Sequence, residues 1–265
     1  MMKKVRLDQL VFERGFTESR ERAKTTVMSG LVYVNGQKAD KPGMPVDPEA
    51  KLEVRGDALP FVSRGGYKLD KALKVFPVDP AGKTCIDCGA STGGFTDVLL
   101  QHGAAKVYSV DVGYGQLAWK LRSDERVVNL ERTNLRYITK EQIPEKLDLA
   151  VMDVSFISIR LVLPAVKELL KPGADYICLI KPQFEAGRDE VGKKGVVRDP
   201  AVHEEVVRGI LDFAPTIGFT VMGLDFSPIR GPEGNIEYIC WLKNGEYEAA
   251  AVDPAAVVKA SHEAF

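Results

Sequence analysis

Between residues 67 and 243, short apolar segments with the composition of β-strands alternate with segments at helical spacing. Strands that are separated by helices run parallel, and the helices pack on both faces of one sheet. The pattern therefore predicts an α/β domain with a mostly parallel, seven-stranded sheet. The expected strands are 84–89, 106–112, 126–131, 147–153, 176–181, 219–226 and 236–243. The expected helices are about 67–75, 94–102, 115–122, 159–170 and 200–214.

The two ends of this pattern differ from its middle. A turn-rich loop at 227–235 joins the last two strands without a helix, which favours an antiparallel pair at the sheet edge. Before the alternation begins, two helices are expected at 6–14 and about 18–28, followed by strands at 31–34 and 51–54. Asn35-Gly36 between those strands is a strong hairpin signal. We predict a small α+β domain at 1–58, a linker at 59–66, the α/β domain at 67–245 and a C-terminal tail at 246–265, whose alanine-rich sequence favours a terminal helix or an extended tail.

Charge and hydropathy exclude several classes of protein. The formal net charge is −1, so the chain as a whole is not a general binder of polyanions. No apolar run approaches the roughly 20 residues that span a bilayer. The first residues also lack the apolar stretch of a signal peptide, and we therefore expect a cytoplasmic protein with no membrane partner.

The four cysteines do not indicate a metal site. In a reducing compartment they are expected to be free thiols. Cys85 and Cys88 lie within one expected strand, where side chains three positions apart point to opposite faces and cannot easily share a metal ion. We expect buried thiols and no bound metal.

The segment at 85–95 (CIDCGASTGGF) predicts a strand, a glycine-rich turn and the start of a helix. Glycines at the carboxyl end of such a strand let the backbone approach a ligand closely. The next expected strand ends at Asp111, where a carboxylate can accept hydrogen bonds from both ribose hydroxyls. Together these features indicate an adenosine-containing cofactor. The alternative is a glycine turn that only makes a tight connection.

The spacing of Gly89, Gly93 and Gly94 is not that of a dinucleotide fingerprint, and the loop lacks a phosphate-binding lysine. It is compatible with a nucleoside that carries an amino-acid tail, as in S-adenosylmethionine. Asp87 is placed to meet the cationic end of that ligand, and Asn134 to meet the adenine edge. The residues expected to bind the cofactor are Asp87, Gly89, Ser91, Gly93, Gly94, Phe95, Asp111 and Asn134.

Charged residues occur where apolar strands end. Asp153 and Lys181 finish the fourth and fifth strands, Glu237 lies in the last strand, and Lys68 opens the helix before the first strand. A buried charge in such a position costs free energy unless it is paired with an opposite charge or has a role in binding or catalysis. The carboxyl ends of parallel strands also meet at the ligand crevice. A structural ion pair between Asp153 and Lys181 is the alternative to a catalytic role.

These residues resemble a known family. The order Lys68, glycine loop, Asp153, Lys181 and Glu237 resembles the Lys-Asp-Lys-Glu tetrad of FtsJ-like RNA ribose 2′-O-methyltransferases. The motifs Arg6-Leu7-Asp8, Ser19-Arg20, Ala23-Lys24 and 30–36 resemble the S4 RNA-binding domain. Combined with 63–69 (SRGGYKL) and 181–185 (KPQFE), they look like the TlyA family, also named hemolysin A, of rRNA cytidine-2′-O-methyltransferases.

The resemblance covers essentially residues 3–243. It implies a Rossmann-like methyltransferase sheet, S-adenosylmethionine as cofactor, and ribosomal RNA (16S, 23S or both) or ribosomal subunits as partner. It makes Lys68, Asp153, Lys181 and Glu237 the catalytic residues. In-line methyl transfer to a ribose needs a positioned, partly deprotonated oxygen, and Lys181 could take the proton or stabilise the alkoxide. The sequence leaves open which lysine is neutral.

Basic residues are concentrated at the front of the chain, where residues 1–24 hold seven basic and four acidic side chains. With the S4 resemblance, we expect these to follow a phosphate backbone rather than form an ordinary solvated face. The glycine-rich segment 187–199 is expected to be a mobile loop that closes over substrate. The expected RNA-binding residues are Lys3, Lys4, Arg6, Arg20, Lys24, Lys193, Lys194 and Arg198.

Other functions remain as alternatives. Methylation of a base amino group would favour an Asn/Asp-Pro-Pro-aromatic turn after the fourth strand, where this chain has Asp153-Val154-Ser155-Phe156. Methylation of a base carbon would need a cysteine in a catalytic loop. A non-catalytic ribosome-associated factor is disfavoured by the complete tetrad. A membrane-lytic protein, as the old family name suggests, needs an amphipathic segment that is not evident here.

Overall fold

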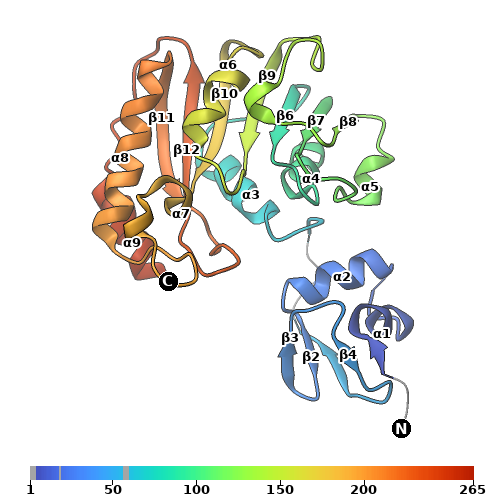
Figure 1. The fold of residues 1–265 in the computed structure, drawn as a ribbon. Coiled ribbons are helices and arrows are strands. Elements are labelled where there is room, and N and C mark those ends of the chain that lie inside the picture. The colour runs from blue at the N-terminus through green and yellow to red at the C-terminus, as the bar shows by residue number, and fades with distance from the viewer. Residues whose placement is uncertain (1–3, 18, 56–59) are drawn as a thin grey trace. The chain divides into compact units, whose positions relative to one another are not determined.

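The computed structural model describes residues 4–17, 19–55 and 60–265. The chain forms two compact units, Met1–Arg64 and Gly65–Phe265, and each buries a hydrophobic core of its own (Figure 1). The division between them falls within the segment predicted as a linker. Lys3, one of the predicted RNA-binding residues, lies outside the described residues.

The first unit is a small α+β domain. Its two helices pack against each other, and β2 is the central strand of a three-stranded antiparallel sheet with β3 and β5. Asn35 and Gly36 both have positive φ, at 51° and 81°, as a two-residue hairpin turn requires. The unit also holds a short pair, β1 with β4, which the sequence did not predict because two-residue strands show no alternation. The elements are β1 Val5–Arg6, α1 Leu7–Glu13, α2 Arg20–Met28, β2 Val32–Val34, β3 Gln37–Ala39, β4 Pro45–Val46 and β5 Leu52–Val54.

The second unit contains the predicted seven-stranded sheet, in the order β11-β12-β10-β9-β6-β7-β8. Five strands, β6 to β10, run parallel to their neighbours within that set, whereas β12 is antiparallel to both β10 and β11. The predicted antiparallel pair at the sheet edge is confirmed, and β12 is its inner member. The strands are β6 Thr84–Cys88, β7 Lys106–Val110, β8 Val127–Leu130, β9 Leu147–Met152, β10 Leu170–Ile180, β11 Phe219–Phe226 and β12 Tyr238–Asn244.

The direction of β12 determines where the functional side chains meet. The carboxyl ends of β6, β7, β9 and β10 lie at one edge of the sheet. Because β12 is antiparallel, it begins at this same edge, and its first residue, Tyr238, pairs with Ile180 at the end of β10. The residue before β12 and the residue after β10 are therefore neighbours, although 56 positions separate Glu237 from Lys181 in the chain.

Helices cover the sheet and are shorter than expected in two places. Only Trp119–Arg122 of the segment 115–122 is helical, and 159–170 divides into a 3₁₀ turn and a short helix. Pro164 explains the division, since proline fits the first turn of a helix but not its interior. The helices are α3 Gly66–Val75, α4 Gly94–Gln101, α5 Trp119–Arg122, α6 Leu163–Lys167, α7 Pro182–Glu185, α8 Pro200–Thr216 and α9 Pro254–Ala264, with 3₁₀ turns η1 Leu135–Tyr137, η2 Ile159–Leu161 and η3 Arg188–Glu190.

Residues 246–265, expected as a terminal helix or tail, contain a helix and belong to the second unit. They contain α9, which packs against α8 and β11 (Figure 1). Val258 and Ser261 of this helix are buried, at 2% and 0% exposed. An alanine-rich amphipathic segment has a weak apolar pattern in isolation, and only the presence of α8 and β11 gives it a surface to cover.

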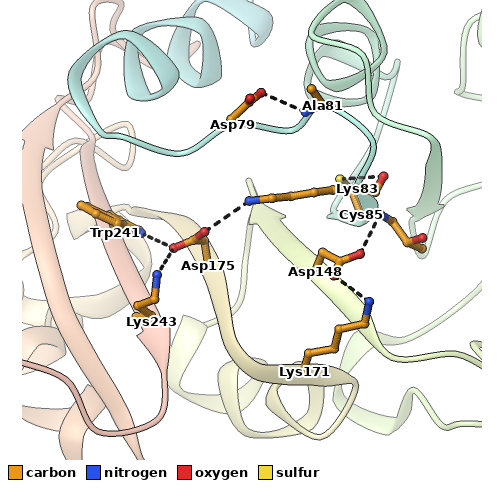
Figure 2. Close-up of polar contacts among 10 residues, drawn as sticks. Asp79, Ala81, Lys83, Cys85, Asp148, Lys171, Asp175, Trp241 and Lys243 are labelled. Atoms are coloured by element: carbon orange, nitrogen blue, oxygen red, sulfur yellow. Dashed lines mark hydrogen bonds and ion pairs between the residues drawn. The ribbon is translucent and has the colours of Figure 1, made fainter.

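A buried carboxylate stabilises the opposite, amino-terminal part of the sheet. Asp175 of β10 accepts a hydrogen bond from Trp241 Nε1 at 3.0 Å, and the ammonium groups of Lys83 and Lys243 each lie 3.4 Å from it (Figure 2). Nearby, Asp148 is paired with Lys171 at 2.6 Å. These contacts connect β6, β9, β10 and β12 far along the strands from the edge where the catalytic residues are expected.

Candidate active site

The loop between β6 and α4 turns through three residues with positive φ, namely Gly89 at 87°, Ser91 at 48° and Gly93 at 94°. A Cβ atom on Gly89 would lie 2.8 Å from the carbonyl oxygen of Asp153, and one on Gly93 would lie 2.2 Å from Leu121 Cδ1. Gly89 therefore requires glycine on grounds of conformation and of space, and Gly93 on grounds of conformation. Gly94 begins α4, and Phe95 is buried beneath the loop.

Asp111 follows β7 and connects this loop with the next one. Its carboxylate accepts hydrogen bonds from the backbone N–H groups of Ser91, at 2.8 Å, and Gly113, at 2.7 Å. The side chain is partly exposed, and Val112 beside it is 69% exposed. A carboxylate and an exposed aliphatic side chain thus lie together at the mouth of the glycine loop, and the sequence analysis did not single out Val112.

Asp87 is fully buried beneath the same loop. Its Oδ2 atom accepts hydrogen bonds from the Thr96 backbone N–H at 2.9 Å and from the Thr96 hydroxyl at 2.7 Å. Its Oδ1 atom has no hydrogen-bond partner among the residues that the structure describes. Burial raises the pKa of Asp87 to about 7, despite the two hydrogen bonds, which oppose the shift.

The raised pKa of Asp87 predicts a specific pH dependence of folding. A carboxyl with a pKa near 3.8 when unfolded and about 7 when folded stabilises the protein below the lower value, and this stability is lost as the pH rises through the window between them. Asp87→Asn removes that titration. We expect the unfolding free energy of wild type, relative to this variant, to fall by about 2 kcal/mol between pH 5 and pH 7. Urea denaturation at several pH values measures it, and a pH-independent difference would contradict it.

Asn134, predicted to meet an adenine edge, caps a 3₁₀ turn in this structure. Its side chain accepts a hydrogen bond from the Arg136 backbone N–H at 3.1 Å, and the residue is exposed after β8. This hydrogen bond uses the side-chain oxygen of Asn134 and not its side-chain nitrogen.

The four residues of the predicted tetrad form one connected, buried cluster. The ammonium group of Lys68, on α3, is 3.0 Å from Asp153 Oδ2 and 2.6 Å from Glu237 Oε2. Lys181 Nζ is 2.5 Å from Asp153 Oδ1 and donates to Ser155 Oγ at 3.0 Å. Lys68, Lys181 and Glu237 are 6%, 6% and 1% exposed. Two cations and two carboxylates thus leave the cluster neutral, as burial demands.

The two lysines have different carboxylate partners. Burial alone would lower the pKa of Lys68, but the adjacent carboxylates of Asp153 and Glu237 outweigh it and raise that pKa above its ordinary value. Burial likewise opposes ionisation of Asp153, whereas Lys68 and Lys181 hold its pKa below the usual range. Lys68 is therefore a permanent cation that orients two carboxylates. Lys181 is equally buried but contacts one carboxylate and one hydroxyl, and its ammonium group lies 5.8 Å from the centroid of the Phe184 ring.

An exposed aromatic residue lies beside this cluster and was not predicted. Phe156 is 91% exposed, has a φ of 63°, and its ring centroid is 5.1 Å from that of Phe184. Its loop is fastened to α7, because Glu185 accepts hydrogen bonds from the Ser158 hydroxyl at 2.7 Å and the Ile159 N–H at 2.8 Å. A strained backbone that presents a large apolar ring to solvent is a signal of function that only coordinates reveal.

The basic residues of the first unit are exposed, and two of them lie close to one buried carboxylate. Arg6 binds Asp8 through two hydrogen bonds of 3.0 and 2.8 Å, and Arg20 lies 4.0 Å from the same carboxylate. Asp8 is buried, so it fixes both guanidinium groups at the surface. Lys4 and Lys24 are exposed as well.

In the second unit, Lys193, Lys194 and Arg198 are exposed on the predicted loop 187–199. This loop is more structured than a mobile-loop prediction implies. Gly192 and Val196 form a β-bridge, and Val196 and Val197 are buried at 8% and 2% exposed. The three basic side chains are thus carried on a folded turn.

The four cysteines are free and buried in strands, as predicted. Among residues 4–17, 19–55 and 60–265, no three His, Cys, Asp or Glu side chains are grouped to hold a metal ion. In the same part of the chain, no helix has the length and apolarity to cross a bilayer.

Comparison with known proteins gives concordant matches. A model of the FtsJ-like methyltransferase family matches residues 61–244, and a model of the S4 domain matches residues 5–52. The "Putative rRNA methyltransferase YqxC" of Bacillus subtilis is 55% identical over 241 residues, which cover 91% of this chain and 86% of that protein. The "16S/23S rRNA (cytidine-2'-O)-methyltransferase TlyA" of Mycobacterium tuberculosis is 46% identical over 244 residues, which cover 92% and 91%.

A solved structure agrees along the whole chain. The "Putative hemolysin from Streptococcus thermophilus" is 46% identical, with a TM-score of 0.80, and the match covers 100% of this chain and 98% of that one. The family model for the methyltransferase domain spans more than half of the residues, and the TlyA match spans nearly all of them. The chain is a member of the TlyA (hemolysin A) family, with an S4 domain followed by an FtsJ-like methyltransferase domain.

Proposed function

We propose that this protein transfers a methyl group from S-adenosylmethionine to the 2′-hydroxyl of a cytidine in ribosomal RNA. The observation that carries the proposal is the buried cluster of Lys68, Asp153, Lys181 and Glu237 beside the glycine loop. A related protein, TlyA of Mycobacterium tuberculosis, is named for this activity on 16S and 23S rRNA. A cytoplasmic location, where ribosomal subunits are available, is part of the proposal.

The residues around the glycine loop fit S-adenosylmethionine. The positive-φ turn exposes backbone at the end of β6, and Asp111 offers a carboxylate for the ribose. The orphaned Oδ1 atom of Asp87 is suited to a cationic amino group. The residues proposed to hold the cofactor are Asp87, Gly89, Ser91, Gly93, Gly94, Phe95, Asp111, Val112 and Asn134. When bound, this cofactor supplies an electrophilic methyl group on a sulfonium.

The tetrad would prepare the ribose hydroxyl. Asp153 and Ser155 occupy two of the three ammonium hydrogens of Lys181, which leaves one direction for a substrate oxygen. In its charged form Lys181 would stabilise the developing alkoxide, and as a neutral amine it would accept the proton. Lys68 and Glu237 position Asp153, which in turn holds Lys181. No metal is required by this arrangement, because lysine supplies the positive charge.

Asp111→Ala tests the cofactor site. We expect the affinity for S-adenosylmethionine and for S-adenosylhomocysteine to fall by about 1–3 kcal/mol, because ribose hydroxyls lose their acceptor. Isothermal titration calorimetry measures the loss, and NAD serves as the negative ligand. Asp148→Ala is a matched control, since Asp148 is also a paired aspartate but lies at the far end of β9. Unchanged affinity of the Asp111 variant would remove that residue from the site.

Phe156 is proposed as a stacking surface for a nucleotide of the substrate. Its exposed ring and fixed loop suit a base that has left its helix. Loss of one base–aromatic stack costs about 1–3 kcal/mol, so Phe156→Ala should lower kcat/KM for RNA by roughly 5- to 150-fold. Phe156→Trp should retain most activity, and cofactor affinity should not change in either variant. Equal rates for alanine and wild type would exclude the stacking role.

The proposed RNA contacts divide between the two units. Lys3, Lys4, Arg6, Arg20 and Lys24 are proposed phosphate contacts of the S4 domain, and Lys193, Lys194 and Arg198 those of the methyltransferase domain. Exposed cations bind a phosphate backbone with little dependence on sequence and release counterions as they do so. Increasing salt should therefore weaken binding of ribosomal RNA but not of cofactor.

The experiment that tests the function is transfer of labelled methyl from S-adenosylmethionine to purified ribosomal subunits, followed by mapping of the labelled nucleotide. We expect label on a cytidine ribose, and no transfer when that residue carries a 2′-deoxyribose. Label on a base would assign the protein to base methylation. Cofactor binding without transfer to either subunit, or to free rRNA, would favour a non-catalytic factor.

A further inference from the structure

Hydrogen bonds join the loop 187–199, which carries Lys193, Lys194 and Arg198, to Asn235 and Tyr238, two residues that lie on either side of Glu237 in the chain. Asn235 reaches the loop directly, since its Oδ1 accepts from the Val197 N–H at 3.0 Å and its Nδ2 donates to the Gly195 carbonyl at 2.9 Å. Asn235 is 3% exposed. An amide side chain supplies both an acceptor and a donor, so the two contacts also fix its orientation.

The second half of the path runs through a buried histidine. His203, on α8, contacts the Val197 carbonyl oxygen through Nε2 at 3.0 Å and the Tyr238 hydroxyl through Nδ1 at 2.7 Å. A carbonyl oxygen only accepts, so Nε2 carries the hydrogen and Nδ1 of the neutral ring accepts from Tyr238. Burial lowers the pKa of His203, which favours this neutral form. Both His203 and Tyr238 are 0% exposed.

Val197 is thus held by both of its peptide groups. Its N–H group is bound by the residue two positions before Glu237, and its carbonyl is bound, through His203, to the residue immediately after Glu237. Glu237 itself has little freedom, because its own carbonyl accepts from the Ser227 N–H at 2.8 Å and a Cβ on Gly231 would lie 2.8 Å from its Oε1. A shift of Val197 must therefore move Glu237 or break buried hydrogen bonds.

We propose that Asn235, His203 and Tyr238 are positioning residues that couple the basic loop 187–199 to the catalytic cluster through Glu237. The partner of the loop is the phosphate backbone of the RNA substrate, matched by the exposed charges of Lys193, Lys194 and Arg198. Engagement of phosphate at the loop steadies Val197, and Glu237 then holds Lys68 and Asp153 in place for Lys181. The effect of this coupling on catalysis rests on the proposed function, whereas the mechanical coupling between the loop and Glu237 does not.

The physical case for coupling is the cost of leaving these groups unpaired. Each buried peptide group that loses its partner destabilises the local structure by about 1–3 kcal/mol. Asn235→Ala removes the partners of two peptide groups, the exposed Gly195 carbonyl and the buried Val197 N–H, and the cost falls on the latter. Tyr238→Phe keeps the ring in the core and removes the hydroxyl that contacts His203 at 2.7 Å and the Ser261 hydroxyl at 3.1 Å, so it disturbs the path without removing the buried ring.

The structural arm of the test is hydrogen exchange of the 191–198 segment. In Asn235→Ala and in Tyr238→Phe we expect exchange at the Val197 amide to accelerate at least about tenfold. Because coupling is reciprocal, Glu237→Gln should accelerate exchange at the same amide, although it lies outside the loop. Asn244→Ala is the matched control, since Asn244 is a buried asparagine at the other end of β12 that donates to the Lys171 carbonyl at 2.9 Å. It should leave the loop unchanged.

The catalytic arm is a double-mutant cycle on the full-length protein. Replacing Lys193 and Lys194 by alanine should lower kcat as well as raise KM for RNA, and Asn235→Ala should lower kcat with cofactor affinity unchanged. Combined, the changes should be non-additive in kcat by about fivefold or more, since both break one path. Additivity within twofold, together with normal Val197 exchange in Glu237→Gln, overturns the proposal. If no variant, and not even wild type, methylates RNA, the proposed function fails and the exchange arm still decides the coupling.

Discussion

Lys181→Ala is expected to lower the single-turnover rate of methyl transfer by about a hundredfold to ten-thousandfold, the usual contribution of a general base or of alkoxide stabilisation. The affinity for S-adenosylmethionine should remain within a few-fold of wild type. Lys181 follows β10 and contacts Asp153 and Ser155, whereas the proposed cofactor residues lie in β6 or follow β6, β7 and β8. A group that acts only on the reacting oxygen changes kcat without changing cofactor binding.

If Lys181 has only a structural role, its removal should lower stability rather than the rate of methyl transfer. Removing one partner of a buried ion pair leaves an uncompensated charge and commonly destabilises a protein by about 3–5 kcal/mol. Lys68 still pairs with Asp153 in the Lys181 variant, at 3.0 Å, although it is shared with Glu237, so we expect a smaller loss of stability. A melting curve and a single-turnover rate on the same preparation separate the two roles. A destabilised variant that still transfers methyl groups at the wild-type rate would make Lys181 structural.

Lys83→Ala is a suitable control for this experiment. Lys83 also pairs with a buried aspartate, Asp175, but at the opposite part of the sheet (Figure 2). It should cost some stability because Asp175 loses one of its cations, while Trp241 and Lys243 remain as partners. Its methylation rate should equal that of wild type at a temperature where both are folded. Only a substitution at the carboxyl ends of the strands should change the rate of methyl transfer.

The second large effect is expected from removal of the S4 domain. Residues 65–265 bury a complete core and should bind S-adenosylmethionine with unchanged affinity. Methylation of ribosomal subunits at low substrate concentration should fall by about a hundredfold to ten-thousandfold, because linked binding sites raise each other's effective concentration by factors of that size. Supplying residues 1–64 as a separate polypeptide should not restore the rate.

A finer version of this test keeps the chain intact. Replacing Arg20 and Lys24 by alanine removes two exposed cations from one face of α2 without disturbing the core of the unit. The plot of the logarithm of RNA affinity against the logarithm of salt concentration should become shallower, by about 0.7 to 0.9 for each phosphate that is no longer neutralised. Wild-type methylation of subunits by the 65–265 fragment would show that the S4 domain has no part in recognition.

The fold was largely predictable from local pattern. Each predicted strand of the methyltransferase sheet exists, because β-branched apolar runs between turn residues have few alternatives to a buried parallel strand. The errors occurred where local signals are weak. Pro164 divides a segment whose periodicity favours one long helix. The packing of α9 could not be predicted, because the surface that it covers lies on α8 and β11, which are distant in sequence.

The sequence by itself determined the identity of the chemical groups and the order in which they occur. Asp153 and Lys181 follow apolar strands, and in a parallel sheet such positions necessarily share one edge, so their proximity could be expected. The glycines at 89 and 93 likewise indicated a turn that only they can adopt. Periodicity and residue type suffice for these conclusions because they depend on contacts within one element or between neighbouring strands.

Only the tertiary structure decided how the groups act on one another. The insertion of antiparallel β12 next to β10 brings Glu237 to Lys68, and the two carboxylates keep that lysine charged. The exposed ring of Phe156 and the attachment of Val197 to Asn235 and His203 also appear only in three dimensions. Charge state, strain and buried hydrogen bonds arise from residues far apart in the chain, and no local pattern in a sequence records the distances between them.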